Sequence, residues 1–485
     1  MRLAAMALAL VLAAAAPAAA LERVRGVVHV HSDLSTGEFA LEWLVGLADQ
    51  QKIDALLLTE NYLARVEYGL PPFRALTRVV REERSIRAAP EQYLARVAEV
   101  RARLPHVLLI PGVETMPHYH WTGSPLALDM TVHDLQKNLL VFGVTDPAAL
   151  RALPVVGNAA AGQYTVQSVL DALPVLLLVP GAILVAWRRP VRRRLGRGAY
   201  VVVRQRAWAR GLALCAIGIA AVVRGWPFTV DATPTSADPG VAPYQALIDH
   251  VDRLGGATVW SFPEARDIGE EYVGPVRVGW LTEPYADELL RTFRYTAFGG
   301  VYEDTSTFDE PGRGWDRLLG EYVRGERSRP AWALGESGFH GVTTPKRIGP
   351  VQTVFLARER TEAAVLEALR EGRMYAIHRT RDLGLDLAEF TVTAGGVVAG
   401  IADTVRAPAG TPLEVRIGID ASDSDRHDVR VMLVRNGRLV AIERGATPYR
   451  TVYRETSDGT PLVLRVEARG APPLRVLSNP IFVRP

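Results

Sequence analysis

Along most of the chain, segments with apolar residues at helical spacing alternate with short, continuous apolar runs. EFALEWLVGLADQQKI (38–53) has apolar side chains at helical spacing, whereas DALLLTEN (54–61) is a compact apolar run typical of a buried strand. The same order recurs as a helix at 91–104 before a strand at 106–115, a helix at 244–256 before a strand at 257–267, and a final strand at 331–341. This alternation predicts parallel strands in an α/β sheet or barrel.

The pattern changes near Asp386. From there to the C-terminus, short runs of near-alternating apolar residues, such as LEVRIGID (413–420), are separated by turn residues. Asn436-Gly437 is a strong signal for a two-residue β-hairpin. We therefore predict a C-terminal antiparallel β-sandwich over 383–485, with a structural or substrate-flanking role.

Two segments between these regions carry no charge. ALPVLLLVPGAILVAW (172–187) has about the length that a bilayer core requires, whereas GLALCAIGIAAVV (211–223) reaches that length only if it continues to Val230. Tryptophans near the segment ends suit a membrane interface. The pattern predicts a transmembrane helical hairpin over 166–230, with a buried helical pair in a soluble core as the alternative.

The loop of this hairpin, 188–210, contains nine arginines and no acidic residue. Removing these nine would change the net charge from +3 to −6, so basic charge is not spread over a folded face as nucleic-acid binding requires. Short arginine-rich loops stay on the cytoplasmic side of a membrane. We therefore expect 21–165, 231–382 and the sandwich to lie on the extracytoplasmic, periplasmic side of the cytoplasmic (inner) membrane.

The N-terminus and the composition narrow the class of protein. Residues 1–20 combine Arg2, an apolar stretch and an Ala18-x-Ala20 end, which is typical of a cleaved signal peptide; an uncleaved membrane anchor is the alternative. The single cysteine, Cys215, excludes intramolecular disulfides. A chain of 485 residues with 48% hydrophobic and 22% charged residues predicts more than one packed domain and excludes wholesale disorder.

Imidazoles and carboxylates recur where the predicted strands end. The segment GVVHVHSDLSTG places His29 and His31 on the same side of a strand end. Glu60, Glu114 and His340 stand at the ends of later strands. In α/β barrels chemistry gathers at the carboxyl ends of the strands, and these side chains are ligands for borderline divalent metals. The sequence therefore predicts a metal site.

Two further histidines follow Glu114 in MPHYHWTGS (116–124). His118 and His120 are spaced like a pair of metal ligands, so they could supply a second metal position. Exposed loop histidines without a ligand role are the alternative.

The order of these motifs resembles the PHP (polymerase and histidinol phosphatase) superfamily, in particular its CehA/McbA-like metallohydrolases. The segments HVHSDLSTG, TEN, PGVE, KNLLV, FPE and SGFHG stand in the order of the family's HxHSxxSDG, TDH, PGxE, KHLLV-like, HPE and SDFHG-like motifs. The resemblance covers roughly 21–145 and 240–380. It implies an α/β fold built on a distorted (β/α)7 barrel, split here into 21–165 and 231–382 by the hairpin, with two or three divalent ions.

The chain retains four of the family's ligands, His29, His31, Glu114 and His340. The positions that depart from the family pattern are Thr36, Glu60, Asn61, Asn138, Phe262 and Gly338. Because phenylalanine and glycine offer no donor atom, the second and third metal positions should be weakened. We expect about one divalent ion, zinc or manganese, held by His29, His31 and Glu114 and completed by water or a nearby carboxylate, with His340 as a further candidate ligand.

Two functions compete at this stage. One is a membrane-tethered, extracytoplasmic hydrolase of small-molecule phosphoesters or other esters, in which His340 or Glu60 transfers the proton. The other is a catalytically inactive PHP-fold module that binds or senses a ligand. A transporter fits poorly, because two spans leave little room for a pathway, and no nucleic-acid partner is expected.

Overall fold

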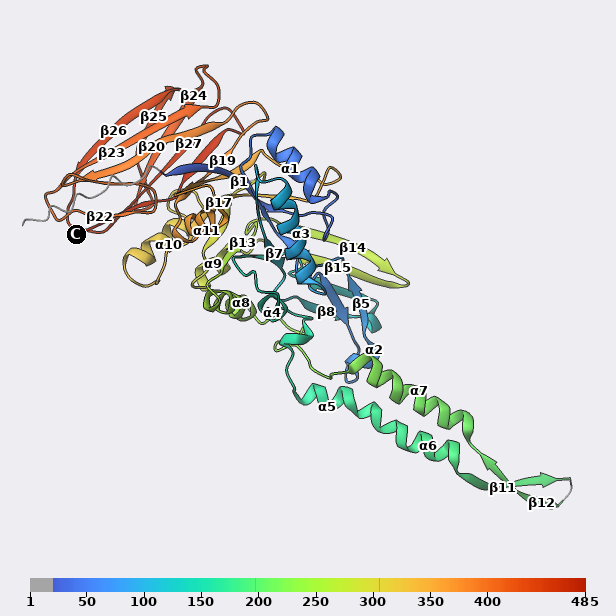
Figure 1. Cartoon of the computed structure of the whole chain (residues 1–485). Helices are drawn as coiled ribbons and strands as arrows, with labels where there is room; N and C mark the ends of the chain where they lie inside the picture. Colours follow the sequence, from blue (N-terminus) through green and yellow to red (C-terminus); the bar gives the residue numbers. More distant parts are fainter. Residues whose placement is uncertain (1–20, 197, 305) are drawn as a thin grey trace, which may run out of the picture.

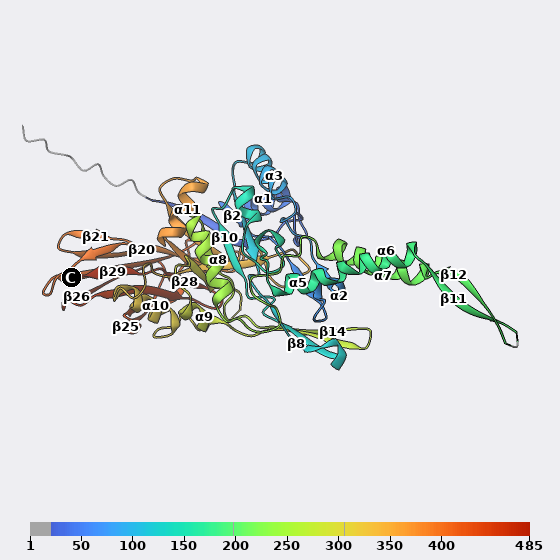
Figure 2. The same cartoon turned by 90° about the horizontal axis from the view of Figure 1, so that it is seen from below.

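A computed structural model of the chain describes residues 21–196, 198–304 and 306–485 (Figure 1). The predicted signal peptide, 1–20, lies outside the described residues. Three parts are visible in both views: a central α/β body, a strand-rich C-terminal part, and a long hairpin that projects from the body (Figures 1 and 2).

The body is built around a sheet that closes on itself. Its strands are β1 (Glu22–Val30), β2 (Ala55–Leu58), β3 (Glu60–Asn61), β6 (Leu108–Ile110), β7 (Gly112–Thr115), β10 (Leu139–Phe142), β13 (Ala257–Trp260), β16 (Ala297–Val301) and β17 (Trp332–Phe339). Hydrogen-bonded pairs lead from β1 through β2 to β6, and β7 follows β6 directly in the chain. From β7 the pairs continue through β10, β13, β16 and β17 back to β1. Residues from both sides of the projecting hairpin therefore form one barrel-like ring.

Most pairs in the ring are parallel, as the sequence predicts, but β10, where no strand was predicted, is an exception. This strand runs antiparallel to both neighbours, β7 and β13. A parallel connection needs a crossover of a dozen or more residues, usually a helix. The chain between β7 and β10 instead forms β8 (His120–Ser124), the 3-10 turn η1 (Pro125–Ala127) and β9 (Asp129–His133), which return it in the opposite direction.

Helices cover the body. They are α1 (Leu41–Gln50), α2 (Arg74–Thr77), α3 (Pro90–Arg103), α4 (Pro147–Arg151), α8 (Ala242–Arg253), α9 (Ala286–Arg291), α10 (Gly314–Val323) and α11 (Glu362–Glu371), with a 3-10 turn η2 (Ala159–Ala161). In α1, the buried residues are Leu41, Leu44, Val45 and Ala48. Their spacing places one apolar face of the helix against the body and explains the predicted helix at 38–53.

Two small sheets extend the body and were not predicted. One pairs β4 (Arg65–Tyr68) with β5 (Val79–Glu82). The other joins β8 and β9 to β15 (Val276–Thr282) and β14 (Asp267–Val273). This second sheet brings the histidines near residue 120 beside a segment more than a hundred residues further along the chain.

The projecting hairpin consists of α5 (Val166–Ala172), η3 (Leu173–Leu177), α6 (Leu178–Ala186), β11 (Arg188–Leu195), β12 (Ala199–Arg206) and α7 (Trp208–Gly225). Its two helical arms, Val166–Ala186 and Trp208–Gly225, are each long and apolar enough to cross a membrane, which by itself is a weak indication. Only 17% of each apolar window is buried. The arms pack closely at glycines, since a Cβ at Gly181 would lie 2.6 Å from the Cys215 sulfur.

The C-terminal part forms two facing layers. One contains β20 (Leu385–Ala394), β21 (Val397–Ala399), β23 (Pro412–Ala421) and β26 (Tyr449–Thr456); the other contains β22 (Thr404–Arg406), β24 (Asp428–Arg435), β25 (Arg438–Ala446), β27 (Leu462–Arg469), β28 (Arg475–Ser478) and β29 (Ile481–Arg484). Buried residues of both layers share one apolar core. The predicted turn at Asn436-Gly437 joins β24 to β25, with both residues at positive φ.

Strand pairing continues across the predicted boundary at residue 383. β18 (Val351–Ala357) pairs with β1, β19 (Met374–His378) pairs with β18, and β28 pairs with β19. The sheet of the body therefore continues into one layer of the C-terminal part. Side chains from β18 and β19, including Val354 and Tyr375, belong to its apolar core.

Candidate metal centre

A break in β1 places the first histidine. His29 has a φ of 73°, in the left-handed region that non-glycine residues rarely adopt. The register of β1 shifts between Val28 and Val30 against both of its neighbours, so His29 occupies a bulge. Bulges re-aim side chains and are common beside active sites. Regular strand alternation therefore does not explain the pair His29 and His31, although the two rings do meet.

Three imidazoles converge at the end of β1 and β17. The ligand atoms of His29, His31 and His340 all lie within 4.8 Å of one another. The Nε2 atoms of His29 and His31 are 3.0 Å apart. The rings of His31 and His340 stack at 3.9 Å between centroids. Residues from the two ends of the body are thus brought together, as a shared site requires.

Glu114 completes this group from β7. Its two carboxylate oxygens lie 3.3 Å from His29 Nε2 and 3.4 Å from His31 Nε2. The amide of Asn138 donates a hydrogen bond of 2.7 Å to the same carboxylate. Asn138, which stands where the family has a histidine, therefore orients Glu114. The four residues predicted as retained ligands, His29, His31, Glu114 and His340, form one cluster.

A second carboxylate, Glu336, contacts His29 on the Nδ1 side of the ring, away from His31. His29 Nδ1 lies 2.6 Å from Glu336 Oε1, and the Ser261 hydroxyl donates to the same oxygen at 2.5 Å. The backbone N–H of Phe262 donates to Oε2. Gly299 makes room for this carboxylate, since a Cβ there would lie 2.1 Å from Oε2. A carboxylate that accepts from Nδ1 fixes the tautomer with its lone pair on Nε2, as in many metal sites.

His340 is oriented by a shorter chain of hydrogen bonds. Its Nδ1 lies 3.1 Å from the Thr36 hydroxyl, and the Asn61 amide donates to that hydroxyl at 3.1 Å. Thr36 and Asn61 stand where the family has an acid and a histidine. In this chain they position His340 instead.

The electrostatics of the cluster favour a cation. Burial opposes ionisation of Glu114, but the neighbouring histidines outweigh it and lower its pKa to about 2. Burial also opposes charge on His29, yet Glu114 and Glu336 raise its pKa to about 10. Burial and the adjacent imidazoles hold the pKa of His31 well below its usual range. Two buried carboxylates therefore keep one positive charge at this place.

These residues fit a divalent metal. The donor set is imidazole and carboxylate, which suits zinc and similar ions. His29 Nε2, His31 Nε2 and the Glu114 oxygens face one another at 3.0 to 3.4 Å, and His31 Nδ1 is buried without a hydrogen-bond partner among the described residues. A cation among these atoms would replace the proton that His29 otherwise carries.

Glu60, predicted as a proton-transfer residue, makes its hydrogen bonds elsewhere. It is buried at the start of β3, and its carboxylate accepts from the Ser32 backbone N–H at 2.9 Å, from the Ser32 hydroxyl at 2.5 Å and from Ser35. Burial raises its pKa to about 7. Glu60 thus orders the loop after His31, and it is not in the group whose ligand atoms lie within 4.8 Å of one another.

Phe262 occupies the side of the cluster where the family has a histidine. Its ring stacks on His29 at 5.3 Å between centroids. Gly338, in place of the family's aspartate, lies against it, because a Cβ at Gly338 would be 2.8 Å from the Phe262 ring. The two departures are therefore coupled: an apolar ring fills the space, and the smallest residue admits it.

His118 and His120 are not among the residues of this cluster. His120 groups instead with Asp134 and Asp238, their ligand atoms within 4.8 Å of one another. His118 is buried beside them, since the charges of His120, Asp134 and Asp238 all act on its pKa. The ligand role predicted for the two histidines stays a prediction, and His118 is not a member of the group that contains His120.

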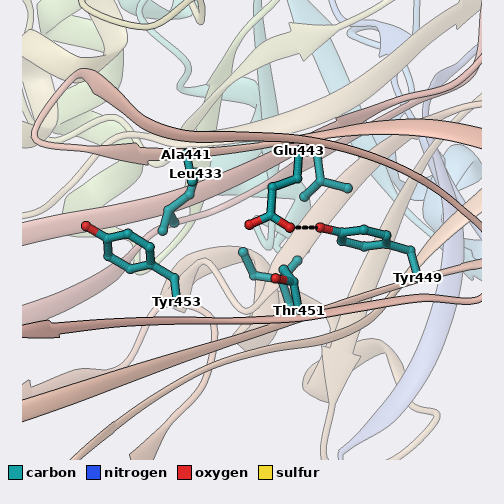
Figure 3. A pocket seen from close by; sticks show the side chains of 8 residues that line it. Leu433, Ala441, Glu443, Tyr449, Thr451 and Tyr453 are labelled. Atoms are coloured by element: carbon teal, nitrogen blue, oxygen red, sulfur yellow. Dashed lines mark hydrogen bonds between the residues drawn. The ribbon is translucent and has the colours of Figure 1, made fainter.

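Two cavities lie away from the imidazole cluster. The gap between β24, β25 and β26 holds about 10 Å³ and is lined by Glu443 and Tyr449, which are hydrogen-bonded to each other (Figure 3). It has room for roughly one water molecule. A larger cavity of about 580 Å³ lies at the base of the projecting hairpin, where Arg65, Arg224 and Trp226 are among its lining residues.

Sequence reasoning missed three residues of the centre's surroundings. Ser261 and Asn138 are neutral and carry no ligand signal, and their roles depend on tertiary contacts. Glu336 falls within the predicted strand at 331–341, yet nothing in the sequence pairs it with His29. The register of β1 against β17, which aligns Val28 with Glu336, makes that pair.

No protein-family model and no curated protein matches the chain. Among solved structures, a two-domain protein from Bacteroides vulgatus, described as containing a PHP-like metal-dependent phosphoesterase, is 10% identical, with a TM-score of 0.34 over 92% of this chain and 90% of that one. A metal-dependent phosphoesterase from Bifidobacterium adolescentis is 13% identical, with a TM-score of 0.28 over 67% and 90%.

An amidohydrolase from Chromobacterium violaceum is 14% identical, with a TM-score of 0.26 over 65% of this chain and 87% of that one. A TM-score below 0.5 does not establish a shared fold. Function is therefore inferred from the residues of the site and from the motif order in the sequence.

Proposed function

We propose that this protein is a metal-dependent hydrolase of phosphoesters or other esters, built on a PHP-type (β/α)7 barrel with a reduced metal site. The observation that carries the proposal is the convergence of four side chains. His29 Nε2, His31 Nε2 and the Glu114 oxygens face one another at 3.0 to 3.4 Å, and a ligand atom of His340 lies within 4.8 Å of those of His29 and His31. Buried imidazoles and carboxylates are rarely arranged in this way for stability alone, because such groups normally pair with opposite charges.

Each residue of the cluster has a distinct task in this proposal. His29, His31 and Glu114 would hold one ion, zinc or manganese, and Glu336 would keep His29 in the required tautomer. A bound divalent ion supplies activation of water and polarisation of a substrate oxygen. His340 is the candidate for proton transfer, since Thr36 orients its ring and burial lowers its pKa, so that it is neutral near pH 7.

The hairpin is proposed as a membrane tether. The most hydrophobic 18-residue stretch of each arm is only 17% buried within the protein. Packing against the body therefore does not account for the hydrophobicity of the arms. Arginine-rich β11 and β12 lie at the far end, beyond both arms (Figure 1). The positive-inside rule places that end in the cytoplasm and the barrel and sandwich on the periplasmic side of the inner membrane.

A catalytically inactive binding or sensing module is the second candidate, and Phe262 favours it. The ring that stacks on His29 replaces a ligand with an apolar surface. Hydrolysis of phosphoesters gains from two ions that stabilise both the attacking and the leaving oxygens. A single-ion site would therefore hydrolyse phosphoesters slowly or act on more reactive esters.

Metal analysis separates the two candidates. The full chain, purified in detergent, is loaded with zinc or manganese, and bound metal is measured beside hydrolysis of a phosphomonoester and a carboxylic ester. The hydrolase proposal expects one ion at this centre and ester cleavage, both lost in His29→Ala. If the chain binds an ion but cleaves neither ester, the binding module is favoured. If His29→Ala binds as much metal as the wild type, the hydrolase proposal is contradicted.

The tether has its own test. In a chain without Cys215, a single cysteine introduced at Gly196 should react with membrane-impermeant reagents only after the inner membrane is opened. A cysteine introduced at exposed Ser424 of the sandwich should react without that step. Labelling at 196 from the periplasmic side would contradict the proposed topology.

A further inference from the structure

A second group of ligating side chains lies on the small sheet formed by β8 and β9. His120 begins β8, Asp134 follows β9, and Asp238 comes from the loop after the projecting hairpin. One ligand atom from each lies within 4.8 Å of the other two. His120 Nδ1 is 3.6 Å from Asp134 Oδ2 and is buried without a hydrogen-bond partner among the described residues.

Buried nitrogens without partners support a ligand in this region. His118, close to this group in the chain, is 2% exposed, and its Nε2 is buried with no hydrogen-bond partner in the described part of the chain. A buried imidazole nitrogen without a partner costs free energy, as it does at His120 Nδ1.

We propose that His120, Asp134 and Asp238 form a second divalent-metal site, separate from the imidazole cluster of the barrel. The site takes an ion of zinc type, because imidazole and carboxylate are ligands that zinc binds. It does not depend on the proposed hydrolase activity.

Lys137 leaves part of the Asp134 carboxylate available to an ion. Lys137 Nζ lies 3.0 Å from Asp134 Oδ1, and Glu288 also binds this ammonium at 2.9 Å. Lys137 thus occupies one oxygen of Asp134, while the other oxygen, Oδ2, faces His120.

The position of Asp238 gives the site a structural task. Asp238 caps its own turn by accepting from the Gly240 backbone at 2.7 Å, and the Trp121 backbone N–H donates to Thr235 at 2.8 Å. The segment that follows the hairpin, around Thr235, is therefore hydrogen-bonded to β8. An ion held between Asp238 and His120 would fasten that segment to the barrel.

The two metal sites are neighbours but use different residues. Lys137 and Asn138 are consecutive residues that contact different clusters. Lys137 binds Asp134 of the second site, whereas Asn138 donates to Glu114 of the imidazole cluster. Variants of either group can therefore be compared within one protein, with the other group as an internal reference.

The test is zinc binding by the full chain in detergent, measured by competition with a chromophoric chelator. Asp238→Asn is the main variant, because Asp238 is exposed and asparagine retains the acceptor for Gly240. We expect it to weaken one zinc site at least about tenfold, and His120→Ala to remove that site. Zinc should also raise the Tm of the wild-type chain more than that of either variant.

Matched controls make the result decisive. His427→Ala removes another imidazole paired with a carboxylate, Asp423, in the C-terminal part, and should leave zinc binding unchanged. His29→Ala should leave this second site intact, so failure of the hydrolase proposal and failure of this one are distinguishable. The proposal is overturned if Asp238→Asn and His120→Ala, both folded by circular dichroism, bind as much zinc as the wild type with equal affinity.

Discussion

Two buried charge clusters in this protein are built on opposite plans. At the junction of the body with the C-terminal part, Arg465 on β27 forms a bidentate ion pair with Asp316 on α10, at 2.8 Å for both contacts. Nearby, Arg475 pairs with Asp309 and with Glu467. In this junction cluster, cations face anions.

In the imidazole cluster, by contrast, several metal-ligating groups surround one position. The Nε2 atoms of His29 and His31 are 3.0 Å apart, and two carboxylates, Glu114 and Glu336, share the first of these rings. Pairing opposite charges joins two parts of a fold, whereas bringing imidazoles and carboxylates together lets an external cation replace the proton of His29. The difference indicates which cluster is structural and which is a candidate for chemistry.

The largest effect is expected at the junction cluster. Asp316→Ala leaves the fully buried Arg465 guanidinium without its carboxylate, although the contact with the Trp315 ring remains. Removing one partner of a buried pair costs about 3–5 kcal/mol of the free energy of unfolding. Chemical denaturation of the full chain measures this loss.

A matched surface pair provides the control for that experiment. Asp420 pairs with Arg450 at 2.6 Å, and both side chains are 40 to 50% exposed. Asp420→Ala should cost less than about 1 kcal/mol. Equal losses in the two variants would contradict the structural role assigned to the junction cluster.

The second effect concerns Glu60, a buried carboxylate that serines surround without a cation. Burial raises its pKa from 4.5 to about 7, so the native state holds this proton over a pH range in which the unfolded chain releases it. The contribution of Glu60 to stability therefore falls as pH rises from 4.5 to 7. Glu60→Gln should remove a pH dependence of at most about 3 kcal/mol.

Unfolding curves at several pH values between 4.5 and 8 test this expectation. The stability of Glu60→Gln relative to the wild type should improve as pH rises. Exposed Glu83→Gln provides the control and should not change the pH profile to this extent. A wild type and a Glu60→Gln variant with parallel profiles would show that Glu60 titrates at its ordinary value.

A third effect separates metal affinity from stability. Glu336→Gln keeps the size of the side chain but removes the negative charge that fixes the His29 tautomer. Loss of such a supporting partner typically weakens metal binding by about 10–100-fold. Titration with zinc in the presence of a competing chelator measures the change.

Glu264→Gln is the matched control for metal binding. Glu264 also follows a barrel strand, but its carboxylate binds Ser306, Thr307 and the Phe308 backbone, so it orders a loop. Its substitution should leave zinc affinity unchanged. A loss of affinity in Glu264→Gln equal to that in Glu336→Gln would contradict the specific role of Glu336.

The sequence predicts the chemistry of the site better than its geometry. The positions of His29, His31, Glu114 and His340 at strand ends bring all four together, as parallel strands with a common edge require. The bulge at His29 was not predictable, because it depends on the register of β1 against both neighbours.

Long-range pairing explains the remaining differences in the fold. The reversal at β10 follows from the small sheet of β8, β9, β15 and β14, whose strands are far apart in sequence and too polar to show a buried pattern. The pairing of β19 with β28 joins the body to the C-terminal part. The sequence predicted a boundary there because the apolar pattern changes to short alternating runs. Local propensity contains no signal for either contact.

The smallest effect tests whether Phe262 and Gly338 depend on each other. Gly338 has a φ of 69°, and a Cβ there would lie 2.8 Å from the Phe262 ring. Gly338→Ala should therefore cost about 1–2 kcal/mol from the backbone alone, with a further cost from the contact. In a Phe262→Ala background the contact disappears, so the penalty for Gly338→Ala should fall by about 0.5 kcal/mol or more. Chemical denaturation of the four proteins in this double-mutant cycle measures the coupling, and additive losses would show that the aromatic ring and the glycine are independent.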